Sequence, residues 1–257
     1  MNNINIKEYV KNEMLKLKTS AQAHVKLGII DATDSMASRT YIRNKIKDFE
    51  ELGWEAKVYE EDSSVPQAVE RAVEDGCTAI MAQLPTKEGV TFDPTMVPPE
   101  YDCDGFHPMS YCLPATARGV MEYLREVGFC CEGSLCVVVG QGMTAGKPIA
   151  DELRKAKATV ATLNSKTPWK VKNILLKDAD LVVVATGRHG VVCREDCPHA
   201  LVIDVGINFV DGKMCGDFIE NEETKKGECW STPVPGGVGL LTRLGMLRNC
   251  LDLVKKG

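Results

Sequence analysis

The sequence lacks several features that would place it in a whole class of proteins. No apolar run approaches the roughly 18 residues of a transmembrane helix. Residues 1–8 have neither the basic start nor the apolar core of a secretory signal. The formal net charge is −5, so no basic excess indicates a nucleic-acid or membrane-surface partner. We expect a cytoplasmic protein that binds neither nucleic acid nor membrane.

The sequence also lacks a pattern for a metal centre or a disulfide framework. Its 11 cysteines are odd in number, and several, such as Cys136, lie in apolar runs, which is typical of a reduced compartment. Cys193 and Cys197 have a CxxxC spacing near His199, but no second pair follows at zinc spacing. We expect no metal. Internal repeats and low-complexity segments are absent as well.

What the chain does contain is an alternation of strand-like and helix-like segments. Such an alternation is typical of parallel sheets with helical crossovers. The 257 residues suffice for one large or two smaller α/β domains. Strands are expected at 25–30, 54–59, 78–82, 134–139, 159–163, 181–185 and 200–204, and helices at 40–52, 66–75, 118–127, 147–157 and 240–255. The pattern predicts two α/β lobes joined by the helix that begins near Arg118.

A glycine-rich turn in the second lobe indicates nucleotide binding. It follows a predicted strand, opens a predicted helix and reads GQGMTAGKP over residues 140–148. Gly140 allows a tight turn, Gly142 lets a ligand approach the backbone, and N–H groups at the helix start face a pyrophosphate. The spacing is one residue longer than the usual dinucleotide fingerprint. A glycine turn needed only for geometry is the plainer interpretation, and the strand–turn–helix context favours the nucleotide.

The end of the next predicted strand bears on which dinucleotide is bound. It reads LNSKT over residues 163–167, and no Asp or Glu stands where a ribose 2′-hydroxyl is usually held. Ser165 and Lys166 are suited to a 2′-phosphate instead. The sequence therefore favours NADP, with NAD as the alternative.

Two further runs are unusual for a structural role alone. Residues 102–108 read DCDGFHP, a loop in which Gly105 frees the backbone and Pro108 ends regular structure. A surface turn capped by Asp104 is the plain interpretation, and a functional loop is the other. Residues 232–239 read TPVPGGVG, a rigid loop poor in side chains that a flat ligand can approach.

Taken together, these runs resemble the bifunctional methylenetetrahydrofolate dehydrogenase/methenyltetrahydrofolate cyclohydrolase family. The resemblance also rests on ASRTYIRNK at 37–45, QLP at 83–85 and IDVGIN at 203–208, and it covers nearly the whole chain in order. It implies two α/β lobes around a cleft, the second a Rossmann-like NAD(P)-binding domain with a parallel sheet. The expected division is residues 1–118 with the returning helix 240–257 for folate and catalysis, and residues 119–239 for NAD(P). It also implies a homodimer through the nucleotide lobe.

The resemblance gives roles to residues that suit them chemically. Tyr41 and Lys45 are an i, i+4 pair and share one helix face, which could equally be a solvated surface. In the family the tyrosine stacks on the pterin and the lysine is the catalytic group, a task that suits a lysine whose pKa is lowered. Gln83 would orient that lysine, and Asp104 would bind the amino-pyrimidine edge of the pterin. We expect Asp102 to be structural.

The implied activity belongs to one-carbon metabolism. A hydride leaves 5,10-methylenetetrahydrofolate for the nicotinamide, and water then opens the methenyl product to 10-formyltetrahydrofolate. Tetrahydrofolate derivatives are the expected partners. Further substrate contacts are implied at Leu84, Pro85, Pro235, Gly236 and Gly237. Cofactor contacts are implied at Gly140, Gln141, Gly142, Gly146, Lys147, Pro148, Asn164, Ser165, Lys166, Thr186, Gly187, Gly206 and Ile207.

The chain departs from the family pattern in ways that bear on specificity. Gln141 and Gly142 stand where the family usually has Arg-Ser, which removes a positive charge near the expected 2′-phosphate and keeps NAD open. The segment after Pro108 is about ten residues shorter than usual, and Tyr101 replaces a lysine before the aspartates. A dehydrogenase without the second activity, a shikimate-dehydrogenase-like enzyme and a non-enzymatic nucleotide-binding protein remain as alternatives.

Overall fold

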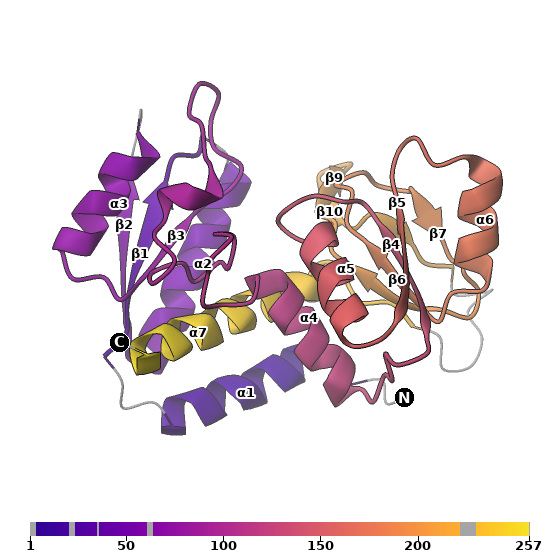
Figure 1. Cartoon of the computed structure of the whole chain (residues 1–257), viewed down its shortest axis with the longest axis horizontal. Coiled ribbons are helices and arrows are strands. Elements are labelled where there is room, and N and C mark those ends of the chain that lie inside the picture. The colour runs from indigo at the N-terminus through magenta and orange to yellow at the C-terminus, as the bar shows by residue number, and fades with distance from the viewer. Residues whose placement is uncertain (1–3, 21–23, 35, 61–63, 222–229, 257) are drawn as a thin grey trace. The chain divides into compact units, whose positions relative to one another are not determined.

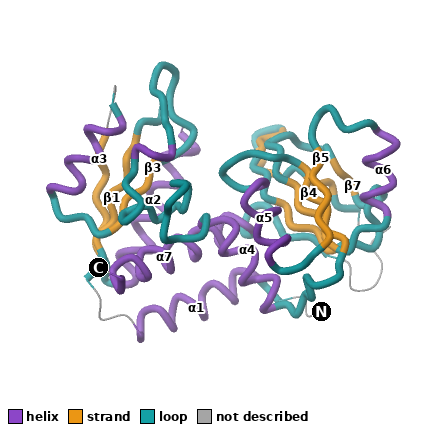
Figure 2. The backbone as a smooth tube through the Cα atoms, in the orientation of Figure 1, coloured by secondary structure: helices purple, strands orange, loops and turns teal. Residues whose placement is uncertain are grey.

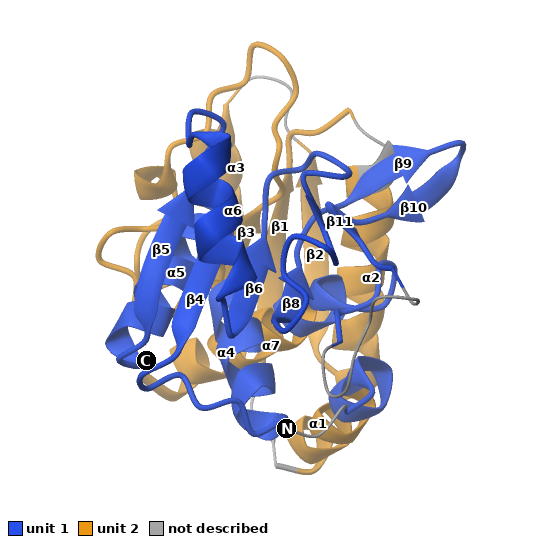
Figure 3. Cartoon of the chain, turned by 90° about the vertical axis from the view of Figure 1, so that its right-hand side faces the viewer, with its two compact units in different colours: residues 1–10, 116–242 blue, residues 11–115, 243–257 orange. Residues whose placement is uncertain are grey.

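The computed structural model describes residues 4–20, 24–34, 36–60, 64–221 and 230–256 (Figures 1 and 2). The chain divides into two compact units, neither continuous in sequence (Figure 3). Unit 1 comprises Met1–Val10 and Thr116–Thr242, and unit 2 comprises Lys11–Ala115 and Arg243–Gly257. The expected division placed the first ten residues with the folate lobe, whereas here they group with the lobe expected to bind the nucleotide.

Unit 2 is built on a short parallel sheet in the order β2-β1-β3. Its strands are β1 (Lys26–Asp31), β2 (Glu55–Glu60) and β3 (Ala79–Ala82), and the crossovers are α2 (Met36–Leu52) and α3 (Val65–Glu74). Central strand β1 pairs with both neighbours, so its middle residues are buried on both faces, as expected for a covered parallel sheet. Gly28 allows α3 to pack closely, since a Cβ there would lie 3.0 Å from the Cβ of Ala72.

Three further segments complete unit 2. They are most of α1 (Ile6–Ser20), the short 3-10 helix η1 (Pro94–Met96) and α7 (Val238–Lys256) from Arg243 onward. Arg248 of α7 forms an ion pair with Glu13 of α1, which joins the two ends of the chain within this unit.

Unit 1 contains a four-stranded parallel sheet in the order β5-β4-β6-β8. The strands are β4 (Leu135–Val139), β5 (Thr159–Leu163), β6 (Leu181–Val184) and β8 (Leu201–Asp204), with helices α4 (Ala115–Glu126), α5 (Gly146–Lys155) and α6 (Trp169–Lys177). Strand β5, which follows β4 in sequence, pairs with one edge of β4, and β6 pairs with its other edge, so the strand order reverses at β4. Ligands of open α/β sheets bind outside the carboxyl ends of the strands at such a switch point.

Short strands decorate unit 1 beyond β6. Strand β7 (Val192–Cys193) pairs with β11 (Phe218–Ile219), and β9 (Asn208–Val210) forms an antiparallel hairpin with β10 (Lys213–Cys215). The hairpin turns through Asp211 and Gly212, both with positive φ, which is the geometry of a two-residue type I′ turn.

The predicted fold class is confirmed, and every predicted strand and helix occurs, all but the strand at 159–163 with a shift at one or both ends. The helix expected at 40–52 begins at Met36, and the helix expected at 118–127 begins at Ala115. The sequence did not predict helices α1 and α6 or the short strands β7, β9, β10 and β11. Over the described ranges, no helix combines the length and apolar character needed to cross a membrane.

Candidate active site

The side chain of Lys45 is buried in unit 2, which is unusual for a lysine. It projects from α2 and is 4% exposed. Its Nζ donates to Gln83 Oε1 at 3.1 Å and lies 2.9 Å from Met81 Sδ, and the ring centroid of Tyr41 lies 5.0 Å away. The i, i+4 spacing puts Tyr41 and Lys45 on one helix face, and β3 with the residue after it supplies the other contacts. The structure thus brings three of the four predicted catalytic residues into direct contact.

Gln83 is held so that its carbonyl oxygen faces the lysine. Its backbone N–H bonds to Ile30 O at 2.9 Å, and its Nε2 donates to Leu84 O at 2.9 Å. With the amide nitrogen engaged, Oε1 is left to accept from Lys45. The Leu84–Pro85 peptide bond that follows is cis.

Burial shifts the pKa values of Lys45 and Asp104 in opposite directions. Desolvation lowers the pKa of Lys45, and the negative charge of Asp104 partly opposes this. Desolvation also raises the pKa of Asp104 to about 6; the positive charge of Lys45 opposes that rise, and the neighbouring Asp102 adds to it. The pair therefore places a lysine and a carboxyl group whose titrations both lie nearer neutrality than usual.

The loop that carries Asp104 is fixed by Asp102. The Asp102 carboxylate accepts the backbone N–H groups of Gly105 at 3.0 Å and His107 at 2.8 Å. Gly105 has φ +73°, and a Cβ there would lie 2.5 Å from the backbone of Leu113. No other residue fits that place, because both the positive φ and the close approach require glycine.

The segment after Pro108 closes back on this loop through a residue that sequence reasoning missed. Asn249 of α7 is fully buried and donates from Nδ2 to Cys103 O and to Leu113 O, both at 2.8 Å. Ala115 N also bonds to Asp104 O at 3.0 Å. The last helix therefore holds together the aspartate loop and the shortened segment. Nothing in the sequence around Asn249 distinguishes it from an ordinary helix residue.

In unit 1, the glycine-rich turn has the close packing expected of a nucleotide-binding turn. Gly140 has φ +106°, and a Cβ there would lie 2.1 Å from Ala185 O, at the end of the neighbouring strand β6. A Cβ on Gly146, where α5 begins, would lie 2.3 Å from Gly140 O. Gly142 has open space around it, which leaves room for a ligand. Pro148 is buried in the helix start, while Gln141 and Lys147 are exposed.

The residues after β5 form a tight turn that presents polar side chains to solvent. The Asn164 side chain accepts the backbone N–H of Lys166 at 2.8 Å, and Asn164 N donates to Thr167 Oγ1 at 3.0 Å. Asn164, Ser165 and Lys166 are exposed. The turn sits at the carboxyl end of the strand next to β4, where the ribose of a dinucleotide is held in Rossmann folds.

A second buried carboxylate, Asp217, organises the loops after β6 and β8. Its Oδ2 accepts from Thr186 N at 2.6 Å, Thr186 Oγ1 at 2.8 Å and Gly187 N at 2.9 Å, and its Oδ1 accepts from Asn208 Nδ2 at 2.8 Å. A Cβ on Gly206 would collide with this carboxylate. Sequence reasoning missed Asp217, although the predicted contacts Thr186, Gly187 and Gly206 all depend on it.

Asp204, at the end of β8, supports Asp217 from behind. Its carboxylate accepts the backbone N–H groups of Gly206, Asp217 and Phe218, each at 3.0 Å. Burial raises the pKa of Asp204 to about 6, and the three N–H groups oppose that rise. Ile207, which follows, is exposed. The predicted cofactor contacts thus lie on loops at the carboxyl ends of β4, β5, β6 and β8.

The proline-glycine run forms the entry to α7. The Val234–Pro235 peptide bond is cis, Gly236 has φ +97°, and a Cβ on Gly237 would lie 2.2 Å from Pro233 O. The backbone of Gly236 and Gly237 is therefore bare of side chains. Elsewhere, within the residues described, no cluster of three His, Cys, Asp or Glu side chains is arranged to hold a metal.

One unit holds a buried lysine site and the other a Rossmann-like sheet with a glycine-rich turn, which together are typical of α/β oxidoreductases, and comparison with known proteins specifies which. The model of the tetrahydrofolate dehydrogenase/cyclohydrolase NAD(P)-binding domain matches residues 114–257. Bifunctional protein FolD of Polynucleobacter asymbioticus is 36% identical over 250 residues, which cover 90% of this chain and 87% of that protein. The chain belongs to the tetrahydrofolate dehydrogenase/cyclohydrolase family.

Solved structures agree with this assignment. The bifunctional FolD enzyme of Campylobacter jejuni superposes with a TM-score of 0.85 at 31% identity, covering 98% of this chain and 95% of that one. The Trypanosoma brucei FolD, solved with NADP and an inhibitor, gives 0.88 at 28% identity, with coverage of 98% and 97%. A shikimate dehydrogenase from Thermus thermophilus shares only the fold, at 16% identity. The predicted family, its dehydrogenase/cyclohydrolase class and its nicotinamide cofactor are confirmed.

Proposed function

We propose that this protein oxidises 5,10-methylenetetrahydrofolate with NADP and hydrolyses the methenyl product to 10-formyltetrahydrofolate, with Lys45 as its central catalytic group. The observation that carries the proposal is the buried Lys45 ammonium, in contact with Gln83 and under the ring of Tyr41. Burying a lysine ammonium costs free energy, and this burial lowers the pKa of Lys45. Buried groups with shifted pKa values are typical of functional sites. A surface role for this helix face is thereby disfavoured.

The hydrolytic half needs a group that moves protons. When bound, the nicotinamide supplies the hydride acceptor for the methylene bridge. Water then adds to the methenyl carbon and loses a proton, and the ring nitrogen that leaves gains one. Lys45 with its pKa lowered takes the first proton and returns it to the nitrogen, while Gln83 keeps its Nζ in place. The second proton of the water leaves to solvent as the formyl carbonyl forms, so the methenyl cation and water give the neutral formyl product and one released proton.

Asp104 and Tyr41 would bind the pterin. An ionised carboxylate accepts two parallel N–H bonds from an amino-pyrimidine edge, and an aromatic ring stacks on the flat bicycle. Leu84 and Pro85 would line the same wall, and Pro235 with Gly236 and Gly237 would offer bare backbone to the ligand.

A matched pair of variants tests the role of Lys45. Lys45→Met keeps the length and apolar stem but removes the ammonium, so we expect cyclohydrolase activity to fall at least about a hundredfold. The assay follows the decay of methenyltetrahydrofolate absorbance. Lys47→Met, on the exposed face of the same helix, is the control and should leave the rate unchanged. Full activity in Lys45→Met would refute the assignment, and an unimpaired dehydrogenase alone would identify Lys45 as specific to hydrolysis.

In this proposal the protein binds NADP rather than NAD, because the turn after β5 contains a lysine and hydroxyl side chains but no carboxylate. Ser165 and Lys166 are exposed there, and the family structure from Trypanosoma brucei was solved with NADP. Lys166→Ala should weaken NADP binding about three- to tenfold and leave NAD unaffected. The control is Lys177→Ala at the far end of α6. Equal loss for both cofactors would contradict a contact with the 2′-phosphate.

We place the protein in the cytoplasm as a homodimer formed through unit 1. The ten cysteines within the described ranges are all free, in keeping with a reducing compartment. The β9–β10 hairpin exposes Phe209 (59%), Val210 and Met214, an apolar surface that a second copy would cover. Sedimentation analysis should give a dimer, and Phe209→Glu should give a monomer. A monomeric parent protein would exclude the proposed assembly.

A further inference from the structure

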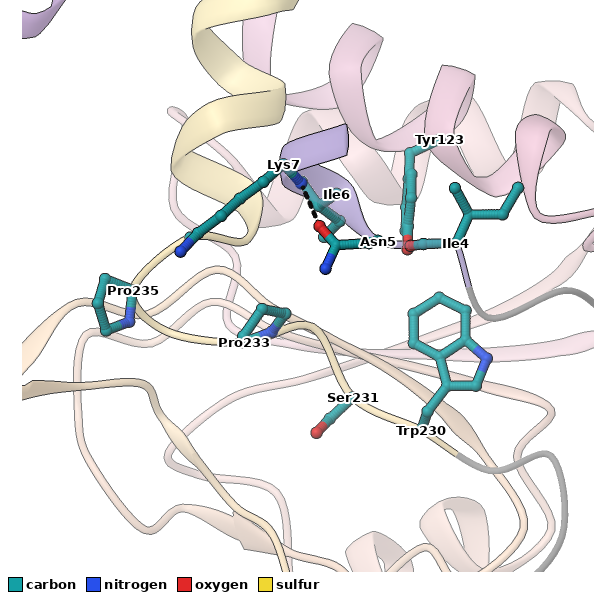
Figure 4. A pocket seen from close by; sticks show the side chains of 10 residues that line it. Ile4, Asn5, Ile6, Lys7, Tyr123, Trp230, Ser231, Pro233 and Pro235 are labelled. Atoms are coloured by element: carbon teal, nitrogen blue, oxygen red, sulfur yellow. Dashed lines mark hydrogen bonds between the residues drawn. The ribbon is translucent and has the colours of Figure 1, made fainter. Parts of the chain in front are cut away.

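The nitrogen of Lys45 depends on protein side chains for its hydrogen bonds, because this side chain is only 4% exposed. Lys7 shows the contrast. It is exposed at the edge of a cavity in unit 1, where its side chain extends toward Pro235 (Figure 4), and within the described part of the chain its ammonium has no acceptor. Water supplies acceptors to an exposed lysine, whereas a buried one relies on its neighbours. The atoms that contact Lys45 Nζ therefore decide where its hydrogens point.

Two acceptors from β3 and the residue after it face this nitrogen. Met81 Sδ lies 2.9 Å from Lys45 Nζ, and Gln83 Oε1 lies 3.1 Å from it. Residues two apart on a strand share one face of the sheet, so Met81 and Gln83 both point toward α2. Ile80 and Ala82 point the other way and pack in the core cluster that includes α3. Because Met81 is itself 2% exposed, its sulfur is held in place by the surrounding core.

The number of these acceptors equals the number of hydrogens on a neutral amine. A lysine ammonium has three N–H donors, whereas the neutral amine has two and a lone pair. Among the residues that the structure describes, Lys45 Nζ has no third hydrogen-bond or ion-pair partner. When the two N–H groups of the neutral amine bond to the sulfur and to the amide oxygen, the lone pair occupies the third direction. A nitrogen held in this way is oriented as a base.

We propose that Met81 is a positioning residue of the active site: its thioether sulfur and the Gln83 carbonyl oxygen accept the two N–H groups of the neutral Lys45 amine, which leaves the lone pair free to take the proton of the attacking water. The inference rests on the proposed function, because it takes Lys45 as the group that moves this proton. Thioether sulfur is a weak acceptor, so Met81 orients the nitrogen while it adds no charge to the site.

The protonation of Lys45 also depends on charged and titratable groups from other elements. They are Asp104 and Cys103 from the loop after β3, Arg243 (paired with Asp48 at 3.2 Å) and Cys250 from α7, and Tyr41 from α2 itself. Burial lowers the pKa of Lys45, and the charge of Asp104 opposes this. A sulfur that accepts from the ammonium opposes it as well, since a hydrogen bond to the charged form favours that form. Loss of the sulfur alone should therefore lower this pKa further.

The test compares Met81→Leu with the parent protein in two measurements. Leucine keeps the apolar volume of methionine and removes the acceptor. With lysine labelled by carbon-13 at Cε, the NMR signal of Lys45, assigned by its loss in Lys45→Met, should titrate about 0.5–1 pH unit lower in Met81→Leu. The cyclohydrolase kcat at its pH maximum should fall about three- to tenfold, with KM for the folate unchanged. Met14→Leu, at a buried methionine of α1, is the control and should match the parent in both measurements.

The outcomes separate a positioning role from simple packing. If Met81 only fills space, leucine replaces it and the Lys45 titration stays where it is. An unmoved titration or an unchanged kcat in Met81→Leu would overturn the inference. Met81→Gln offers an amide oxygen at a similar reach, and recovery of the titration and of kcat in that variant would support it. The titration needs no turnover and so tests the contact by itself, whereas full cyclohydrolase activity in Lys45→Met would overturn the proposed function.

Discussion

Removal of the Asn249 side chain tests how the wall that carries Asp104 is held. Asn249 donates two hydrogen bonds of 2.8 Å from one nitrogen, to the carbonyls of Cys103 and Leu113. Asn249→Ala would leave both carbonyls without this partner. The two segments that they belong to would still be joined by the contacts of Gly105, by the bond from Ala115 N and by the bond from Ser110 Oγ to Asp102 O.

The size of the effect follows from the burial of the two carbonyls. The bond to Cys103 O is buried, and an orphaned buried acceptor costs about 1–3 kcal/mol. The bond to Leu113 O is partly buried, so water replaces it in part and the loss is about 0.5–1 kcal/mol. Together we expect about 1.5–4 kcal/mol, which is a large share of the roughly 5–15 kcal/mol that stabilises a typical domain.

Urea unfolding followed by tryptophan fluorescence and circular dichroism measures this loss. The control is Lys255→Ala, an exposed residue of the same helix, which should change stability by less than about 0.5 kcal/mol. Asn249→Ala should also raise KM for folate while KM for NADP stays constant, because only unit 2 is loosened. A variant as stable as the parent would refute the view that α7 holds the loop through these bonds.

Three further perturbations address the proposed chemistry. Folate KM should rise as pH falls through about 6, because a raised pKa leaves Asp104 protonated and unable to accept two N–H bonds below that pH; Asp104→Asn should show a high KM with no such dependence. Asp217→Asn should raise the Kd for NADP about tenfold, and Thr186→Val, which removes one of the bonds to Asp217, should do so less; equal Kd values in all three proteins would contradict the network. Gln141→Arg should tighten NADP three- to tenfold and leave NAD unchanged, and parallel tightening of NAD would argue against a 2′-phosphate contact.

The predicted helices and strands are those whose apolar residues recur with a helical or strand period, or form a continuous buried run. The continuous apolar run of β4 predicts its strand directly, and Gly53 and Gly76 end α2 and α3 with the positive φ expected of them. Helix α6 was missed because it has only nine residues, of which Leu176 alone is buried, while its apolar residues Trp169 and Ile174 are exposed. Strands of two or three residues, such as β7, carry no period to detect.

In the candidate site too, the sequence predicted the residues that lie in recognisable local motifs and missed those that act through distant partners. Tyr41, Lys45, Gln83 and Asp104 were found through short motifs, and the resemblance to a family gave those motifs their roles. Asp217 and Asn249 act through bonds to residues between 9 and 146 positions away, and their own neighbourhoods contain no signal. A buried polar residue that supports loops from behind is visible only when its partners in space are known.

The division of unit 2 into two pieces also constrains the order in which the protein can be made. Its sheet, β1 to β3, and the loop with Asp104 are synthesised first, and the whole of the unit 1 sheet follows. Asn249 arrives last, near the end of α7. During synthesis the carbonyls of Cys103 and Leu113 therefore lack their bonds to Asn249 until the unit 1 sheet has been translated. A released protein truncated after residue 242 should therefore contain all segments of unit 1 and a unit 2 that lacks Asn249.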